Sequence, residues 1–362
     1  MTIAALYHWP WEIVGDDKEN KQVALLRRSS VASLRVSLIL AAFAVLLRPT
    51  NIFIWLAVLT LTLTRFTLDG ASPLRKSTLL VLVREVVVCG SAVLAASVIS
   101  DRMYFGFWTF PPYKWLYFNV SQSLAVFYGQ MPWHYYLSQG LPLLSTTFLP
   151  FVLVGLYRAT VSSQSTSVLQ SNTLKILSFA VLTTVGILSL ISHKEVRFIY
   201  PLLPVLHVLA APYIASFFTM GPSSTTTSPT PTKTTTLRHK FFLANILSIN
   251  LILATYLSTF HQPAAISVTT FLRHEFERLH PSLLSLSPSP APPPPTEPEP
   301  ELFALFLTPC HSTPWRSHLV YPSLRARALT CEPPLRTAPG SAERAAYRDE
   351  ADRFYEIGRA HV

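Results

Sequence analysis

Long apolar runs constrain the fold of this chain more than any other feature of its sequence. They lie near residues 31–47, 51–65, 79–99, 141–157, 173–192, 198–218 and 241–260, and residues 1–10 resemble the end of a further run. The hydrocarbon core of a bilayer is about 30 Å thick, which about 20 apolar helical residues can cross. Because backbone polar groups in lipid must be satisfied within the segment, each run is expected to be a helix. The sequence therefore predicts an all-α membrane protein with seven complete spans in residues 1–260.

Two of these runs carry features that an ordinary span lacks. The run at 51–65 is short and contains three threonines, so we expect a tilted or partly re-entrant helix that packs inside the bundle. The run at 79–99 contains Arg84 and Glu85 near its start. These two charges either pair inside the bundle or extend to the nearer interface.

The charge composition excludes several classes of protein. Only 13% of the residues are charged and half are hydrophobic, whereas about a quarter of the residues in a soluble protein are charged. The net charge of +10 comes mostly from short loops between apolar runs, where cations set membrane orientation. It therefore does not indicate a nucleic-acid partner. Because no Cys or His spacing resembles a zinc site, we expect no metal and no bound cofactor.

Short-loop Lys and Arg residues occupy alternate loops between the apolar runs. They are Lys18, Lys21, Arg27, Arg28, Arg65, Arg75, Lys76, Arg158, Lys233, Arg238 and Lys240. Cationic short loops face the cytosol. The intervening segments, around Arg48, 100–140, 193–197 and 261–362, are then expected to face the lumen.

Two low-complexity stretches interrupt the chain. Residues 222–236 form a Ser/Thr/Pro-rich stretch in an expected cytosolic loop, and residues 285–301 form a Pro-rich insertion in the lumenal C-terminal region 261–355. Neither composition can bury a core. In the same C-terminal region, Cys310 and Cys331 either form a disulfide or remain two unpaired thiols.

The densest group of ionisable residues is His193, Lys194, Glu195 and Arg197, which lies between two apolar runs. Four such side chains are costly at a bilayer boundary unless they meet each other, water or an anionic headgroup. One interpretation is a solvated turn whose Lys and Arg extend into water. The other is a site that binds an anion.

The segment 100–140 is rich in aromatic residues, which favour the interface between membrane and water. It is either an interfacial element or a platform beside a lipid-linked substrate. Pro112 and Gly129 make one unbroken helix unfavourable here. Asn119 begins an Asn-Val-Ser glycosylation sequon, which requires a lumenal position to be used.

The string His193 to Phe198, HKEVRF, resembles the HKE-x-RF signature of the dolichyl-phosphate-mannose-dependent mannosyltransferases, which act in the lumen on glycosylphosphatidylinositol (GPI) and N-glycan precursors. Further strings at 48–50, 127–142, 309–318 and 329–334 resemble the branch of this family that adds the third mannose of the GPI precursor. The resemblance covers about residues 1–355. The alternatives are the branches that act on the fourth GPI mannose or on N-glycans and, from another class, a multi-span transporter.

The resemblance implies a C-type glycosyltransferase bundle with a small lumenal C-terminal module, in the endoplasmic reticulum membrane. It implies a lipid-linked donor, dolichyl phosphate mannose, and a GPI glycolipid acceptor, joined through an α-1,2 linkage with inversion. Inversion requires a carboxylate that removes the proton of the acceptor hydroxyl. In the family this base is expected in a lumenal loop that would lie upstream of Met1.

The resemblance also suggests roles for the charged residues. His193, Lys194, Arg197 and Arg48 are expected to hold the anionic donor headgroup. Glu195 is expected to orient Lys194 or Arg197, or to contact an acceptor hydroxyl.

Several other residues have two interpretations each. Asp101 and Arg102 either contact substrate or form an ion pair at the membrane boundary. His134 either contacts the acceptor sugar or is the polar end of an aromatic cluster. His311 and Arg316 either touch the acceptor glycan or support the structure beside Cys310.

The last seven residues, 356–362, differ from the family pattern. Their sequence EIGRAHV resembles the translation of a sequencing-adapter oligonucleotide. We therefore expect these residues not to belong to the natural protein.

Overall fold

The computed structural model describes residues 1–15, 28–70, 73–161, 167–220, 236–281, 302–308 and 312–360. The chain divides into two compact units, Met1–Asn250 and Leu251–Val362. Most of the described residues are helical, and the strands within the described residues form two short pairs. The predicted all-α membrane class is therefore confirmed.

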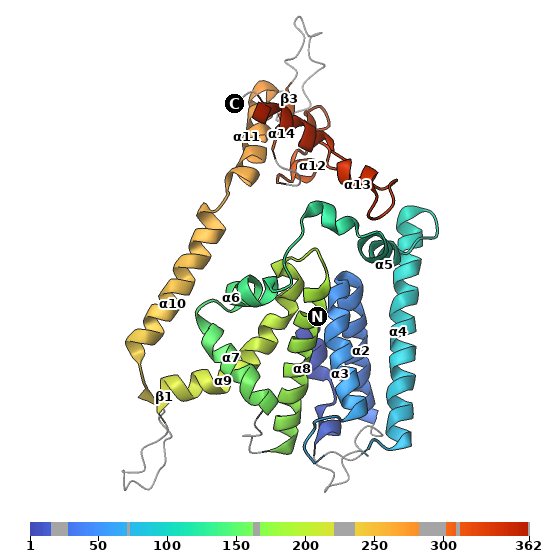
Figure 1. Ribbon diagram of the computed structural model, residues 1–362, viewed down its shortest axis with the longest axis vertical. Coiled ribbons are helices and arrows are strands. Elements are labelled where there is room, and N and C mark those ends of the chain that lie inside the picture. Colours follow the sequence, from blue (N-terminus) through green and yellow to red (C-terminus); the bar gives the residue numbers. More distant parts are fainter. Residues whose placement is uncertain are drawn as a thin grey trace, which may run out of the picture. The chain divides into compact units, whose positions relative to one another are not determined.

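Helices lie at each of the expected apolar runs (Figure 1). They are α2 (Arg28–Leu47), α3 (Ile52–Thr64), α4 (Lys76–Phe105), α7 (Leu149–Val161), α8 (Val168–Leu190), α9 (Leu203–Phe218) and α10 (Lys240–Thr255), preceded by the short α1 (Thr2–His8). In the described part of the chain, six helical segments are long and apolar enough to cross a membrane: Ser29–Leu47, Lys76–Phe105, Tyr136–Val161, Val168–Leu190, Val196–Phe218 and Lys240–Leu279. The apolar helix at Pro49–Thr64 is shorter than these.

The first unit is a bundle in which α3 packs against α8, α7 against α9, and α2 against both α1 and α4. Its core is apolar, with residues such as Leu34, Val58, Ile176 and Leu206 fully buried. Gly155 permits the close approach of α7 to α9, because a Cβ at this position would lie 2.4 Å from the Leu209 carbonyl oxygen. The bundle therefore depends on side-chain size at its tightest contact.

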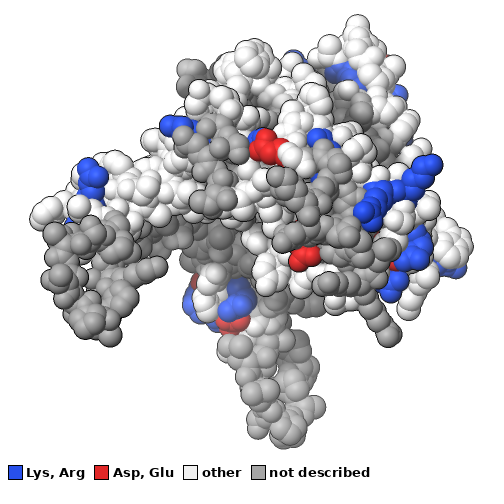
Figure 2. Space-filling view, turned by 90° about the horizontal axis from the view of Figure 1, so that it is seen from below, with Lys and Arg blue, Asp and Glu red and all other residues white. Residues whose placement is uncertain are grey.

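The chain reverses direction at both ends of the bundle (Figure 1). The turn from α2 to α3, the segment after α4 and the turn from α8 to α9 lie at one end, which we call the HKE end. The end of α3, the start of α4 and the start of α8 lie at the opposite end. Figure 2 views the molecule from the side of this opposite end, and Lys and Arg side chains are spread over the visible face with few Asp or Glu.

The segment Tyr136–Val161 is not one continuous α-helix. A π-helical turn, η7 (Tyr136–Gly140), leads into α6 (Leu141–Ser145), and the 3-10 turn η8 (Thr146–Phe148) precedes α7. Thr146 has a φ of 47°, a costly conformation for a β-branched residue. Its hydroxyl donates to the side chain of Asn250 on α10 at 3.0 Å, and the Asn250 amide donates to Thr147 at 2.9 Å. These bonds attach α10 to the break.

Glu85 forms ion pairs inside the bundle, as one of the two sequence interpretations expected. Its carboxylate is 1% exposed and lies 2.7 Å from Arg35 Nε and 2.6 Å from Arg84 Nη2. Both arginine side chains are more than half exposed. Arg35, on α2, was not expected as a partner, and its ion pair joins α2 to α4.

The second unit holds α11 (Ala264–Leu279), β3 (Phe303–Phe306), α12 (Trp315–His318), β4 (Arg325–Ala328), α13 (Ala342–Ala346) and α14 (Glu350–Ala360). Strands β3 and β4 pair in parallel, with Phe303 opposite Arg325 and Phe306 opposite Ala328. The other pair is β1 (Thr219–Met220) with β2 (Thr236–Leu237) in the first unit, antiparallel. The first unit ends at Asn250, ten residues before the expected end of the bundle.

Several expectations fall on residues outside the described ranges. They concern the low-complexity stretches 222–235 and 285–301, Cys310 and His311, and residues 361–362. Cys331 is disulfide-bonded, and the disulfide to Cys310, one of the two alternatives, stays a prediction because Cys310 lies outside the described residues.

Candidate functional site: a charged cluster at the HKE end

The HKE cluster comprises His193, Lys194 and Glu195, which lie between α8 and the 3-10 helix η9 (Val196–Leu202), and Arg197, which lies in the first turn of η9. The segment is fixed on both sides. Ser192 accepts a backbone hydrogen bond of 3.0 Å from Met131. The fully buried Ile199 anchors η9 in the core. The cluster therefore sits on two rigid elements, with the segment around 129–131 beside it.

Lys194 is buried, with an exposed fraction of 3%. Its ammonium donates to the carbonyl oxygens of Met131 at 3.1 Å and Ile191 at 2.5 Å. Burial lowers the pKa of this ammonium below its usual value. Both contacts are to backbone, so Lys194 ties the segment around residue 131 to the end of α8. The substrate contact expected from the sequence stays a prediction for this residue.

His193 makes a hydrogen bond with each ring nitrogen. Nδ1 lies 2.9 Å from the Gly129 carbonyl oxygen, and Nε2 lies 3.0 Å from Glu195 Oε1. A carbonyl and a carboxylate both accept hydrogen bonds, so both ring nitrogens face acceptors. His193 therefore links residue 129 to the carboxylate of the cluster.

Glu195 is the one carboxylate of the HKE cluster. Oε1 accepts from Arg197 Nη2 at 2.8 Å, and Oε2 contacts Arg197 Nε. Burial alone would raise the pKa of this carboxyl, but the hydrogen bonds and charges of His193 and Arg197 outweigh it, so the pKa lies below its usual value. Glu195 is thus ionised at neutral pH and holds Arg197 through both oxygens.

Arg48 joins the cluster from the turn between α2 and α3. Its Nη1 donates to the Arg197 carbonyl oxygen. The turn itself is held by the buried Asn51, whose amide donates to Ala44 at 3.1 Å and to Arg48 at 3.2 Å. The structure therefore places Arg48 and the HKE string side by side, although 149 positions separate Arg48 from Arg197.

The assembled site is positively charged. Arg48, Lys194 and Arg197 supply three positive charges against the single carboxylate of Glu195, a net of +2 with His193 neutral. The Arg197 side chain is 61% exposed, so its guanidinium reaches solvent while Glu195 fixes one edge. Such an arrangement is suited to bind a phosphate-bearing headgroup.

Tyr136 contacts the cluster from the buried interior of the bundle, and this contact was not expected from the sequence. It is fully buried, and its hydroxyl donates to the Glu195 carbonyl oxygen at 3.3 Å. Gly140 makes room for it, because a Cβ there would lie 2.9 Å from the Tyr136 ring. The aromatic string 133–136 gave no signal that separated this buried tyrosine from its exposed neighbours.

The remaining candidates do not contact the cluster. Arg102 lies over the Trp108 ring at 5.8 Å, and within the described contacts it forms no ion pair with Asp101. His134 is exposed and bonds to Ser138 at 3.1 Å. The structure therefore favours local roles for these residues, and their substrate contacts stay predictions.

The predicted glycosylation site is partly exposed. Asn119 lies in a π-helical turn, η5 (Tyr117–Ser121), and its amide donates to the Trp115 carbonyl oxygen at 2.8 Å. An acceptor asparagine must release this bond before it is modified.

Cys331 is partly buried in the second unit.

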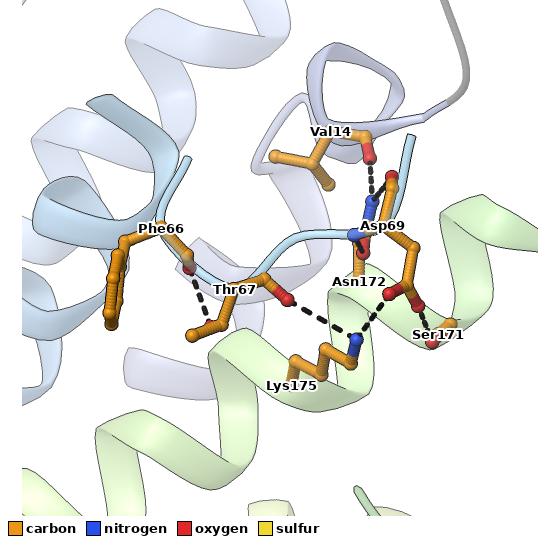
Figure 3. Close-up of polar contacts among 7 residues, drawn as sticks. All are labelled: Val14, Phe66, Thr67, Asp69, Ser171, Asn172 and Lys175. Carbon is orange, nitrogen blue, oxygen red and sulfur yellow. Dashed lines mark hydrogen bonds and ion pairs between the residues drawn. The ribbon is translucent and has the colours of Figure 1, made fainter. Parts of the chain in front are cut away.

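A second polar cluster lies at the opposite end of α8 and was missed by sequence reasoning (Figure 3). The buried Asn172 donates to Val14 at 2.7 Å and to the Asp69 carbonyl at 2.9 Å, and it accepts from the Asp69 amide at 2.7 Å. The Asp69 carboxylate bonds to Ser171 at 2.9 Å and to Lys175 at 2.7 Å. Each member bonds to at least one other member, so the cluster joins the segment after α3 to the start of α8.

The bundle and the HKE cluster define a multi-span membrane protein with a positively charged site at the HKE end. Its sequence places it more narrowly: the chain belongs to the Alg9-like mannosyltransferase family, whose profile matches residues 1–320. The family expected from the HKE-x-RF resemblance is thereby confirmed. Membership also excludes the transporter alternative.

Similar proteins carry one shared name. The chain is 58% identical over 359 residues to GPI mannosyltransferase 3 of Gibberella zeae, covering 98% of this chain and 58% of that protein. It is 44% identical over 328 residues to GPI mannosyltransferase 3 of Aspergillus fumigatus, covering 90% of this chain and 40% of that protein. It is 31% identical over 355 residues to GPI alpha-1,2-mannosyltransferase 3 of Bos taurus, covering 98% of this chain and 51% of that protein. The chain thus spans about half the length of these relatives, and no solved structure matches it.

Proposed function

We propose that the protein containing this chain transfers mannose from dolichyl phosphate mannose to a GPI precursor. It adds the third mannose, through an α-1,2 linkage, in the endoplasmic reticulum membrane. The observation that carries the proposal is the 58% identity with a protein named GPI mannosyltransferase 3. The name of the bovine relative supplies the linkage, and the strings at 309–318 and 329–334 support the third mannose.

The proposed reaction is a direct displacement at the anomeric carbon of mannose. The acceptor hydroxyl oxygen forms the new bond to this carbon while the bond to the phosphate oxygen breaks. The hydroxyl proton passes to a base, and the phosphate leaves with an additional negative charge. Cationic groups that hold the phosphate stabilise this developing charge.

We assign the phosphate to Arg197 and Arg48. Both lie at the HKE end, Arg48 bonds to the backbone of Arg197, and Glu195 orients the Arg197 guanidinium. A guanidinium offers paired donors that match phosphate oxygens. Lys194, whose two bonds go to backbone carbonyl oxygens, is assigned the role of positioning the cluster. Glu195 is not assigned as the base, because it already accepts from His193 and Arg197.

The proposal is tested on the full-length protein, expressed in cells that lack this transfer step. Microsomes receive radiolabelled dolichyl phosphate mannose, and the lipid products are separated by chromatography. We expect label in a GPI precursor with three mannoses, and a loss of at least tenfold for Arg197→Ala. Lys240→Ala, an exposed cation at the other end of the bundle, is the matched control.

Two results would argue against the proposal. Label that enters only an N-glycan precursor, or a GPI precursor with four mannoses, would move the protein to another branch of the family. Normal transfer by Arg197→Ala at a normal protein level would remove this residue from the phosphate site.

A further inference from the structure

A cleft of about 510 Å³ lies in the second unit, at the carboxyl ends of the two parallel strands. Phe306 and Ala328 end β3 and β4 at the same edge, and the segments that follow them line the cleft. Its volume lies within the about 300–1,000 Å³ of pockets that hold small organic ligands. Ligands in sheets with parallel strands bind at this edge.

One wall of the cleft is fixed by Glu350 of α14. Its Oε2 accepts from the Thr330 amide at 2.9 Å and from the Thr330 hydroxyl at 2.8 Å, while Oε1 accepts from Arg327 at 2.7 Å. Tyr347 donates to the Glu332 carbonyl oxygen at 2.9 Å. The wall thus has a defined shape before any ligand arrives, which lowers the cost of ordering on binding.

An aromatic floor and hydroxyl groups make up the rest of the lining. Trp315 is stacked on Phe306, with ring centroids 6.0 Å apart and planes inclined by 20°. The lining also holds Ser312, Thr313 and Ser317, of which Ser312 donates to the Thr308 hydroxyl at 2.9 Å and Ser317 to the Pro314 carbonyl oxygen at 3.1 Å. An apolar floor with a polar rim fits a ligand that has both an apolar face and many hydroxyls.

The cleft also has one cation and one anion that do not pair with each other. Arg316 lies over the Trp315 ring at 5.1 Å, and in the described part of the chain it has no carboxylate partner. The Glu332 side chain is exposed, and none of the described residues pairs with its carboxylate. A guanidinium only donates and a carboxylate only accepts. Sugar hydroxyls do both, so one sugar can satisfy both groups.

We infer that this cleft binds a glycan, namely the sugar chain of the acceptor. The inference rests on the proposed function, since it assigns the acceptor glycan to a specific site in the same protein. A metal ion is a poorer fit, because no group of three His, Cys, Asp or Glu residues in the described ranges can hold one. An inorganic anion would fill little of the volume of the cleft, and the negative charge of Glu332 would repel it.

The test measures KM for the acceptor and for the donor separately in the full-length protein. Arg316→Ala and Trp315→Ala are expected to raise acceptor KM at least fivefold, with donor KM and kcat changed less than twofold. Arg325→Ala, an exposed arginine on β4 outside the cleft, is the matched control and should leave all three unchanged. A cleft that served only folding would instead lower the amount of active protein without changing acceptor KM.

A binding measurement separates failure of this inference from failure of the proposed function. Saturation-transfer NMR with mannobiose is recorded on the detergent-solubilised full-length protein and on Trp315→Ala. A signal that Trp315→Ala abolishes supports the glycan site even if no transfer activity is found. Acceptor KM unchanged in both cleft variants of an active protein, or a mannobiose signal that persists in Trp315→Ala, would overturn the inference.

Discussion

At the scale of single residues, Lys194 and Arg197 differ in what they contact although they are three positions apart. Lys194 is buried against two carbonyl oxygens, whereas the Arg197 side chain is 61% exposed and anchored by Glu195. A buried ammonium that donates to two backbone carbonyl oxygens contributes to stability. A mostly exposed guanidinium contributes little to stability and remains available to a ligand.

Substitutions of these two residues are therefore expected to affect different properties of the protein. Lys194→Ala leaves two carbonyl oxygens without their donor and should lower the free energy of unfolding by about 1–3 kcal/mol. Arg197→Ala should leave the melting temperature close to wild type and abolish transfer. Thermal melting and mannose transfer of the same preparations check both. A Lys194→Ala protein with wild-type stability but no activity would contradict the positioning role.

Glu195 should make the HKE cluster sensitive to acid. Its folded-state pKa lies below the usual value of 4.5, so its ion pairs stabilise the folded state fully above that value. The stabilisation is lost as the pH falls through the lower, folded pKa. The melting-temperature difference between wild type and Glu195→Gln should be constant from pH 7 to about 5 and shrink below it. A difference that persists unchanged at pH 3 would contradict this assignment.

At the scale of helices, the contact between α7 and α9 has the least room for change. A methyl group at Gly155 would lie 2.4 Å from a backbone oxygen of α9, and backbone cannot move aside as a side chain can. Gly155→Ala should therefore separate the two helices and lower the free energy of unfolding by about 1–3 kcal/mol. The melting temperature in detergent measures this.

Gly186 on α8 offers a matched control for that substitution. A Cβ at Gly186 meets nothing within 4 Å, and alanine favours the helix over glycine by about 0.5–1 kcal/mol. Gly186→Ala should therefore be neutral or slightly stabilising. Equal losses of stability at both glycines would mean that helix contact is not the cause.

The helices were largely predictable because apolar runs of this length have few alternatives in a membrane. The break at Thr146 was not, because its left-handed φ and its bond to Asn250 depend on a helix about 100 residues later. Arg35 was missed for the same reason, since its partner Glu85 is 50 positions away. Pairing across the bundle leaves no trace in the local pattern.

The candidate site was predictable in part. The HKE string identified the family and the location, and Arg48 came from a short motif that the fold brings to it. The carbonyl oxygens of Gly129 and Met131, which hold His193 and Lys194, had no signal, because every residue has a carbonyl. The burial of Lys194 was also hidden, since a lysine in a charged string usually indicates a solvated turn.

At the scale of the whole molecule, the orientation in the membrane decides which end of the bundle faces the lumen. If the HKE end faces the lumen, Asn119 is accessible to glycosylation, because it lies in the segment after α4 at this end. Deglycosylation of the full-length protein should then increase its gel mobility, and Asn119→Gln should remove that shift. A cysteine introduced at residue 119 provides a second test. If it is labelled only from the cytosolic side, the expected orientation is wrong.

The hydrogen bonds between Asp69 and Asn172 have a consequence for biosynthesis. The two residues are 103 positions apart, and α3, which packs against α8, is too short to cross a membrane with ease. At about 5–20 residues per second, a ribosome needs about 5–20 seconds to make the intervening chain. During that interval α3 has no permanent neighbour on its α8 side. The face of this short helix that packs against α8 is therefore made several seconds before the helix that covers it.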